Sequence, residues 1–120
     1  MKAQVFIWVG GVMNGLFLIL HLLFWEMFNW PGDLKSLSRD NSSIIQVLNI
    51  HLILVLAMFT YLSLFRSRDM LASSMGRAIS LCIGLFWMVR LVNEALFWDM
   101  GDAMSQGFGL VFLALGLLYL

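Results

Sequence analysis

Three polar or ionisable side chains, Arg90, Asn93 and Glu94, lie within an apolar stretch that runs from Ala78 to Met100. A helix that crosses a bilayer needs about 20 mostly apolar residues, and this stretch has that length. A central Arg costs roughly 2.5–3.5 kcal/mol on the membrane-insertion scale, and each Leu, Ile, Phe or Val returns only about 0.3–0.6 kcal/mol. We therefore expect this helix to turn its charged face toward other helices rather than toward lipid.

Arg90 and Glu94 are four residues apart, so an ion pair can form along one face of this helix. In the structural interpretation, the pair neutralises two buried charges and fixes helix packing. In the functional interpretation, Arg90 binds an anionic or carbonyl group and Glu94 exchanges a proton, because ionisable residues inside a membrane mark functional sites by default. The two interpretations are compatible.

The only two histidines, His21 and His51, lie at similar expected depths, about 10 and 12 Å below the outer surface. Matched depth suggests axial ligation of haem b, or a metal, between two helices. The helical faces argue against it, because turning His51 inward would turn Asn49 and Thr60 toward lipid. A quinone site needs only one histidine and is the more plausible redox arrangement.

A polar pocket is expected in the outer half of the molecule, open to the outside and closed from the cytoplasm. This half contains most of the polar side chains of the apolar stretches, and the inner half contains few. The ligand would be a quinone or a similar amphiphile, with haem b as the alternative. The candidate pocket residues are His21, Asn49, Trp87, Arg90, Asn93 and Glu94.

The elements that must position these residues are four apolar segments, at about 4–28, 43–65, 78–98 and 103–120. Residues are 62% hydrophobic and 12% charged, whereas soluble domains are about 25% charged. We predict an all-α integral membrane four-helix bundle forming one domain over 1–120. Asn41, Ser42 and Ser43 are the expected N-caps of the second helix. A net charge of zero gives no reason to expect nucleic acid as a partner.

The positive charges predict the orientation in the membrane. Four of them fall on one side of the expected spans and two on the other: Lys2, Arg66, Arg68 and Arg77 against Lys35 and Arg39. The positive-inside rule then places both termini, and the basic connector 66–77, in the cytoplasm. The expected location is the cytoplasmic (inner) membrane.

The expected function is that of a small binding or accessory protein, which holds an amphiphilic ligand or a helix of a partner membrane protein. Four short helices bury little internal surface, so a homo-oligomer or a complex with another membrane subunit is expected in addition to the lipid bilayer. Two alternatives stay open. One is a membrane redox protein that uses quinone or haem b, and the other is a small proton-coupled transporter with Glu94 as the proton carrier.

Overall fold

A computed structural model describes residues 1–120 as helices joined by short connections, without a strand. The predicted all-α class is therefore confirmed. The long helices are α1 (Lys2–Leu22), α4 (Arg39–Phe65), α6 (Ser74–Phe97) and α7 (Ala103–Tyr119). Shorter helical pieces are α2 (Phe24–Met27), α3 (Trp30–Asp33), the 3-10 turn η1 (Leu34–Ser36) and α5 (Ser67–Ala72).

Three of the helices, α1, α4 and α6, are long and apolar enough to cross a membrane. The fourth helix, α7, has 17 residues and no charged side chain. At 1.5 Å per residue it extends about 25 Å, close to the shortest length that spans a hydrocarbon core.

The first predicted segment is wrong at its C-terminal end, because α1 stops at Leu22 and α2 is a separate turn. The chain then turns at Asn29, whose φ of 48° lies in the left-handed region. Asn is one of the few residues that tolerate this conformation, since its short polar side chain bonds locally. Pro31 lies within the first turn of α3, where its missing N–H is not needed.

Two other predicted starts are wrong by about one turn. α4 begins at Arg39 rather than 43, because Ser38 caps it: the Ser38 hydroxyl accepts a hydrogen bond from the backbone N–H of Asn41 at 3.2 Å. α6 begins at Ser74 rather than 78, because the Ser73 hydroxyl accepts from the Gly76 amide at 2.9 Å. The basic connector is not an open loop, since part of it forms α5.

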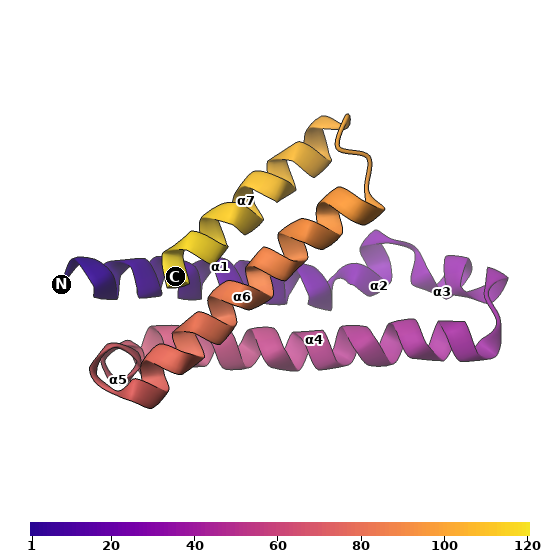
Figure 1. Ribbon diagram of the computed structural model, residues 1–120. Helices are drawn as coiled ribbons and strands as arrows, with labels where there is room; N and C mark the ends of the chain where they lie inside the picture. Colours follow the sequence, from indigo (N-terminus) through magenta and orange to yellow (C-terminus); the bar gives the residue numbers. More distant parts are fainter.

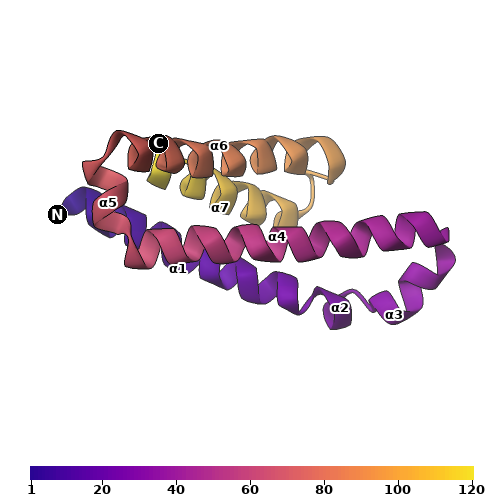
Figure 2. The same cartoon turned by 90° about the horizontal axis from the view of Figure 1, so that it is seen from below.

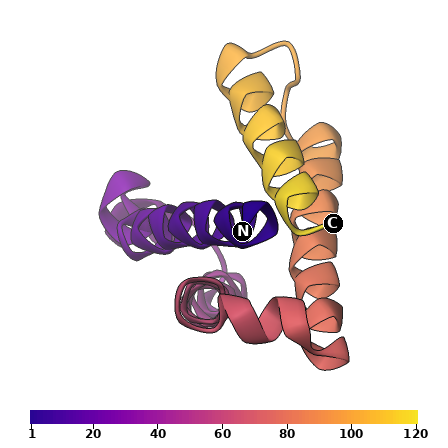
Figure 3. The same ribbon diagram turned by 90° about the vertical axis from the view of Figure 1, so that its left-hand side faces the viewer.

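The long helices form two layers of two antiparallel helices each. α1 runs beside α4, and α6 beside α7 (Figure 1). Viewed from below, the α6–α7 pair lies over the α1–α4 pair (Figure 2). The layers cross obliquely, so the connection between α6 and α7 extends beyond the edge of the other layer (Figure 1). The view along α1 shows α5 bridging from α4 to α6 (Figure 3).

Aromatic rings fill the crossing between the layers. Phe17 of α1 lies 4.9 Å from Trp87 of α6 and 5.6 Å from Phe112 of α7, measured between ring centroids. Phe59 of α4 meets Phe86 of α6 edge to face at 5.2 Å. These contacts belong to one continuous core.

Most of the apolar surface faces outward. Only 22 of the 120 residues are buried, and every long helix exposes large hydrophobic side chains. Soluble monomers rarely expose contiguous apolar patches of this kind. The exposed apolar belt is the surface that a lipid bilayer or a second membrane subunit would cover.

Candidate functional site

The ion pair anticipated on the third long helix is present in the structure. Arg90 Nη2 lies 2.8 Å from Glu94 Oε2, one turn apart on α6. The Glu94 side chain is 3% exposed, whereas that of Arg90 is 31% exposed. Any molecule that reaches the pair would therefore meet Arg90 first.

The Arg90 guanidinium lies against two aromatic rings. Its Cζ is 4.5 Å from the centroid of Phe112 on α7 and 4.9 Å from that of Trp98 after α6. Cation–π attraction compensates part of the cost of removing this charge from water. The Nη1 atom is nevertheless buried without a hydrogen-bond acceptor, and Glu94 Oε2 is buried without a hydrogen-bond donor, so both residues of the ion pair keep hydrogen-bonding capacity that no protein group uses.

His21 is half-buried on α1 and points toward neighbours of its own segment. Its Nδ1 is 2.7 Å from the carbonyl oxygen of Phe17, and its ring lies 4.3 Å from that of Phe24. The Asn49 side-chain amide donates to the His21 backbone carbonyl at 3.1 Å. Asn49 therefore joins α4 to α1, and its hydrogen bond goes to the backbone of His21 rather than to its ring.

His51 does not face His21. Asn49 points toward α1, and two residues further along a helix the side chain has turned by about 200°. His51 is accordingly exposed, with its Nδ1 2.8 Å from the carbonyl oxygen of Val47. The two histidine rings of one chain therefore do not converge between α1 and α4. No three His, Cys, Asp or Glu side chains converge on a point that would hold a metal ion.

Trp87 belongs to a different polar cluster, centred on Asn14 of α1. The Trp87 indole N–H donates to Asn14 Oδ1 at 3.0 Å. The Asn14 amide donates to the Gly10 carbonyl and to the Tyr119 hydroxyl, both at 2.9 Å. The Tyr119 hydroxyl lies 2.6 Å from that of Ser63 on α4. This cluster ties all four long helices together.

Sequence reasoning missed the Asn14 cluster as a unit. Asn14 and Ser63 are recognisable in the sequence as polar residues within apolar segments, but nothing marks Tyr119 as their partner. The signal available is that Asn14 shares a face with Gly10, where a helix can approach closely. In the structure, a Cβ added to Gly10 would lie 2.5 Å from the Tyr119 ring.

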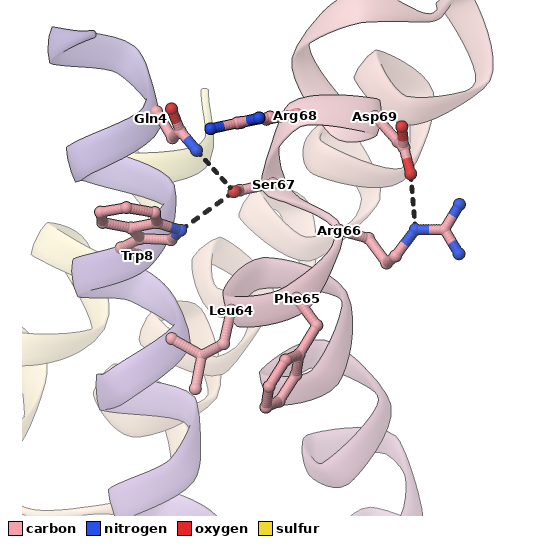
Figure 4. Close-up of a pocket in the computed structure, with 8 residues that line it drawn as sticks. All are labelled: Gln4, Trp8, Leu64, Phe65, Arg66, Ser67, Arg68 and Asp69. Carbon is pink, nitrogen blue, oxygen red and sulfur yellow. Dashed lines mark hydrogen bonds and ion pairs between the residues drawn. The ribbon is translucent and has the colours of Figure 1, made fainter.

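Of the remaining candidates, Asn93 is half-buried beside the ion pair and takes no part in it. Two surface pockets lie elsewhere. One, of about 530 Å³, is at the end where the chain passes from α1 to α4 and includes Trp25, Trp30, Lys35 and Arg39. The other, of about 330 Å³, is at the opposite end, where α1 begins and α4 meets α5 (Figure 4). Neither is lined by Arg90 or Glu94.

Comparison with known proteins supplies no relative. No protein family, no curated protein and no solved structure matches this chain.

Proposed function

We propose that this chain is a four-helix integral membrane protein that binds a carbonyl-bearing amphiphile, such as a quinone, at Arg90. The observation that carries the proposal is the unused donor of the guanidinium: Arg90 pairs with Glu94, yet its buried Nη1 has no acceptor. An unsatisfied buried donor costs about 1–3 kcal/mol. If the pair served packing alone, nothing would offset the cost of the unsatisfied Nη1 donor. A ligand oxygen that accepts a hydrogen bond from Nη1 would remove this cost.

The charge of the site favours a carbonyl over an anion. Glu94 already balances Arg90, so the pair is neutral as a unit. A carboxylate or phosphate would bring an unbalanced negative charge into an apolar surrounding, which is expensive. A carbonyl oxygen accepts a hydrogen bond without adding charge. The Trp98 ring, which is 54% exposed beside Arg90, offers flat apolar surface to the body of such a ligand.

We further propose that α7 spans the membrane with α1, α4 and α6, and that both termini are cytoplasmic. Support comes from the charges. Lys2, Arg66 and Arg68 lie at the end where α1 begins and α4 ends, and only Lys35 and Arg39 lie at the other. The apolar outer surface would contact lipid and either a second copy or another membrane subunit.

The experiment is a thermal-stability measurement on the detergent-purified protein with a benzoquinone that carries a short alkyl chain. The control ligand is the alkylbenzene with the same chain, which lacks the carbonyl groups. The control protein carries Arg90→Met together with Glu94→Leu, because replacing a whole buried ion pair by apolar residues is often neutral for stability.

We expect the quinone alone to raise the melting temperature of the wild-type protein, and to have no effect on the double variant. A ligand at 100 times its dissociation constant stabilises by about 2.7 kcal/mol. Equal stabilisation by the alkylbenzene, or of the double variant, would refute binding at Arg90.

A further inference from the structure

The pocket at the inner end of the molecule has the features of a second binding site. It lies between the first turns of α1 and the junction of α4 with α5 (Figure 4). Its volume is about 330 Å³. Its polar lining includes Gln4, Ser67 and Arg68, and its apolar lining includes Leu64 and Phe65.

Ser67 carries a hydrogen-bond donor that no protein group uses. Its Oγ accepts from the Gln4 side-chain amide at 3.2 Å and from the Trp8 indole N–H at 2.9 Å. A hydroxyl has two acceptor positions and one hydrogen, so both acceptor positions are occupied and the O–H remains to donate. The residue is only 4% exposed. Buried polar groups are normally paired, so this free O–H within the pocket lining indicates a missing acceptor.

Arg68 provides the positive charge beside this donor. Figure 4 shows its guanidinium extending past Ser67 toward Gln4, whereas Arg66 and Asp69 point to the other side. Arg66 donates to Asp69, the single carboxylate of the lining, and this hydrogen bond raises the pKa of Arg66. Since Arg66 and Asp69 neutralise each other, the pocket has a net positive charge from Arg68.

The pocket changes from polar to apolar in the direction of the membrane interior. Leu64 and Phe65 belong to the last turn of α4, directly before the basic residues, and Phe65 is 73% exposed. The Trp8 indole lies alongside, with its N–H toward the polar part. Trp prefers this position at the boundary between headgroups and hydrocarbon. The hydrogen-bond donors at one end of the pocket match the headgroup of a phospholipid, and the apolar side chains at the other end match its acyl chain.

We propose that this pocket binds the headgroup phosphate of an anionic phospholipid, in the leaflet that faces the start of α1. The phosphate oxygens accept from the Ser67 hydroxyl, the second N–H of the Gln4 amide and the Arg68 guanidinium. An acyl chain lies along Leu64 and Phe65. In the proposed orientation this is the cytoplasmic leaflet, where anionic lipids and basic pockets at helix ends occur together. This site is separate from Arg90, so the two proposals fail independently.

The test is native mass spectrometry of the detergent-purified protein with phosphatidylglycerol and, separately, phosphatidylcholine. Arg68→Gln removes the cation and is expected to lower phosphatidylglycerol occupancy about five-fold, the usual effect of one basic residue near anionic lipid. Arg68→Lys keeps the charge and should retain most of the binding. Arg77→Gln is the matched control: it removes an exposed cation outside the pocket lining, and we expect no change.

Ser67→Ala tests the donor without changing the charge. It should also weaken phosphatidylglycerol binding, with circular dichroism showing that the helices remain. Three results would overturn the proposal: equal losses for Arg68→Gln and Arg77→Gln, equal binding of phosphatidylcholine, or displacement of the lipid by inorganic phosphate at the same concentration. The last would assign the pocket to free phosphate.

Discussion

At the scale of residues, the molecule contains two buried polar clusters that differ in how completely they are satisfied. Every polar atom of the Asn14 side chain has a partner, and Trp87 and Tyr119 are among them. The Arg90 guanidinium keeps an unpaired donor. A satisfied network specifies how helices pack, whereas an unsatisfied one calls for an explanation outside the fold. We therefore assign packing to Asn14, and Arg90 is the residue at which the proposed ligand would bind.

Tyr119→Phe tests the packing role of the Asn14 cluster. Removing the hydroxyl leaves one N–H of Asn14 and the hydroxyl of Ser63 without this partner. We expect a loss of about 1–2 kcal/mol of stability in detergent, in line with interhelical hydrogen bonds in membrane proteins. The control is Tyr61→Phe, since Tyr61 is 53% exposed on α4. Equal melting temperatures for the two variants would show that the network contributes nothing.

Glu94→Gln tests whether Arg90 and Glu94 act as a pair. The single change leaves the Arg90 cation without its counter-charge, and removing one partner of a buried pair is strongly destabilising. Because Arg90 is 31% exposed, we expect a smaller cost than for a fully buried pair, about 1–3 kcal/mol. Arg90→Met with Glu94→Leu should recover most of it. A double variant as unstable as the sum of its single changes would mean that the two residues are uncoupled.

At the scale of elements, the sequence predicts the long helices well and their arrangement poorly. Apolar runs identify α1, α4 and α6 because hydrophobic length is a local property. Depth counted at 1.5 Å per residue, as for the two histidines, would place the end of α7 level with the start of α1. Tyr119 instead contacts Asn14, about 18 Å along α1 from Lys2. Counting assumes that all helices start at one level, and the oblique crossing of the two layers breaks that assumption (Figure 1).

The candidate site likewise has one feature that the sequence predicts and others that it does not. The Arg90–Glu94 pair is predictable because it depends only on spacing within one helix. The hydrogen-bond partners of Asn49 and Trp87 are not predictable in this way, because they depend on how the helices meet. Asn49 donates to the α1 backbone and Trp87 donates to Asn14. The pocket between the start of α1 and the junction of α4 with α5 could not be predicted from the sequence either, because Gln4 and Ser67 meet only after the chain folds back.

Gly76→Ala tests the joint between α5 and α6. A Cβ at this position would lie 2.3 Å from the Asp69 carbonyl oxygen and 2.4 Å from Met70 Cα, and backbone atoms cannot move aside as a flexible side chain can. We expect a loss of about 1–3 kcal/mol in thermal unfolding, the range for overpacking. Gly107→Ala on α7 is the matched control, because nothing lies within 4 Å of its added Cβ. It should be neutral or stabilise by up to about 1 kcal/mol.

At the scale of the whole molecule, the two crossed layers leave an apolar exterior with cations at both ends. The proposed orientation predicts which exposed positions an impermeant thiol reagent can reach. In a Cys82→Ala background, Asn41→Cys in the first turn of α4 and Met100→Cys between α6 and α7 should react in intact cells. Ala72→Cys, at the end of α5, should react only after the membrane is opened. The reverse labelling pattern would show that the orientation in the membrane is opposite to the proposed one. Unequal labelling of Asn41→Cys and Met100→Cys would contradict four membrane spans.

The central claim is that Arg90 and Glu94 hold a carbonyl-bearing amphiphile between membrane-spanning helices. The most direct measurement is solvent extraction of the purified protein followed by mass spectrometry, performed in parallel on the wild-type chain and on the variant with Arg90→Met and Glu94→Leu. We predict a carbonyl-containing amphiphile that co-purifies with the wild type and is absent from the equally stable double variant. An extract that is the same for both proteins would contradict the claim and leave Arg90 and Glu94 as a packing pair.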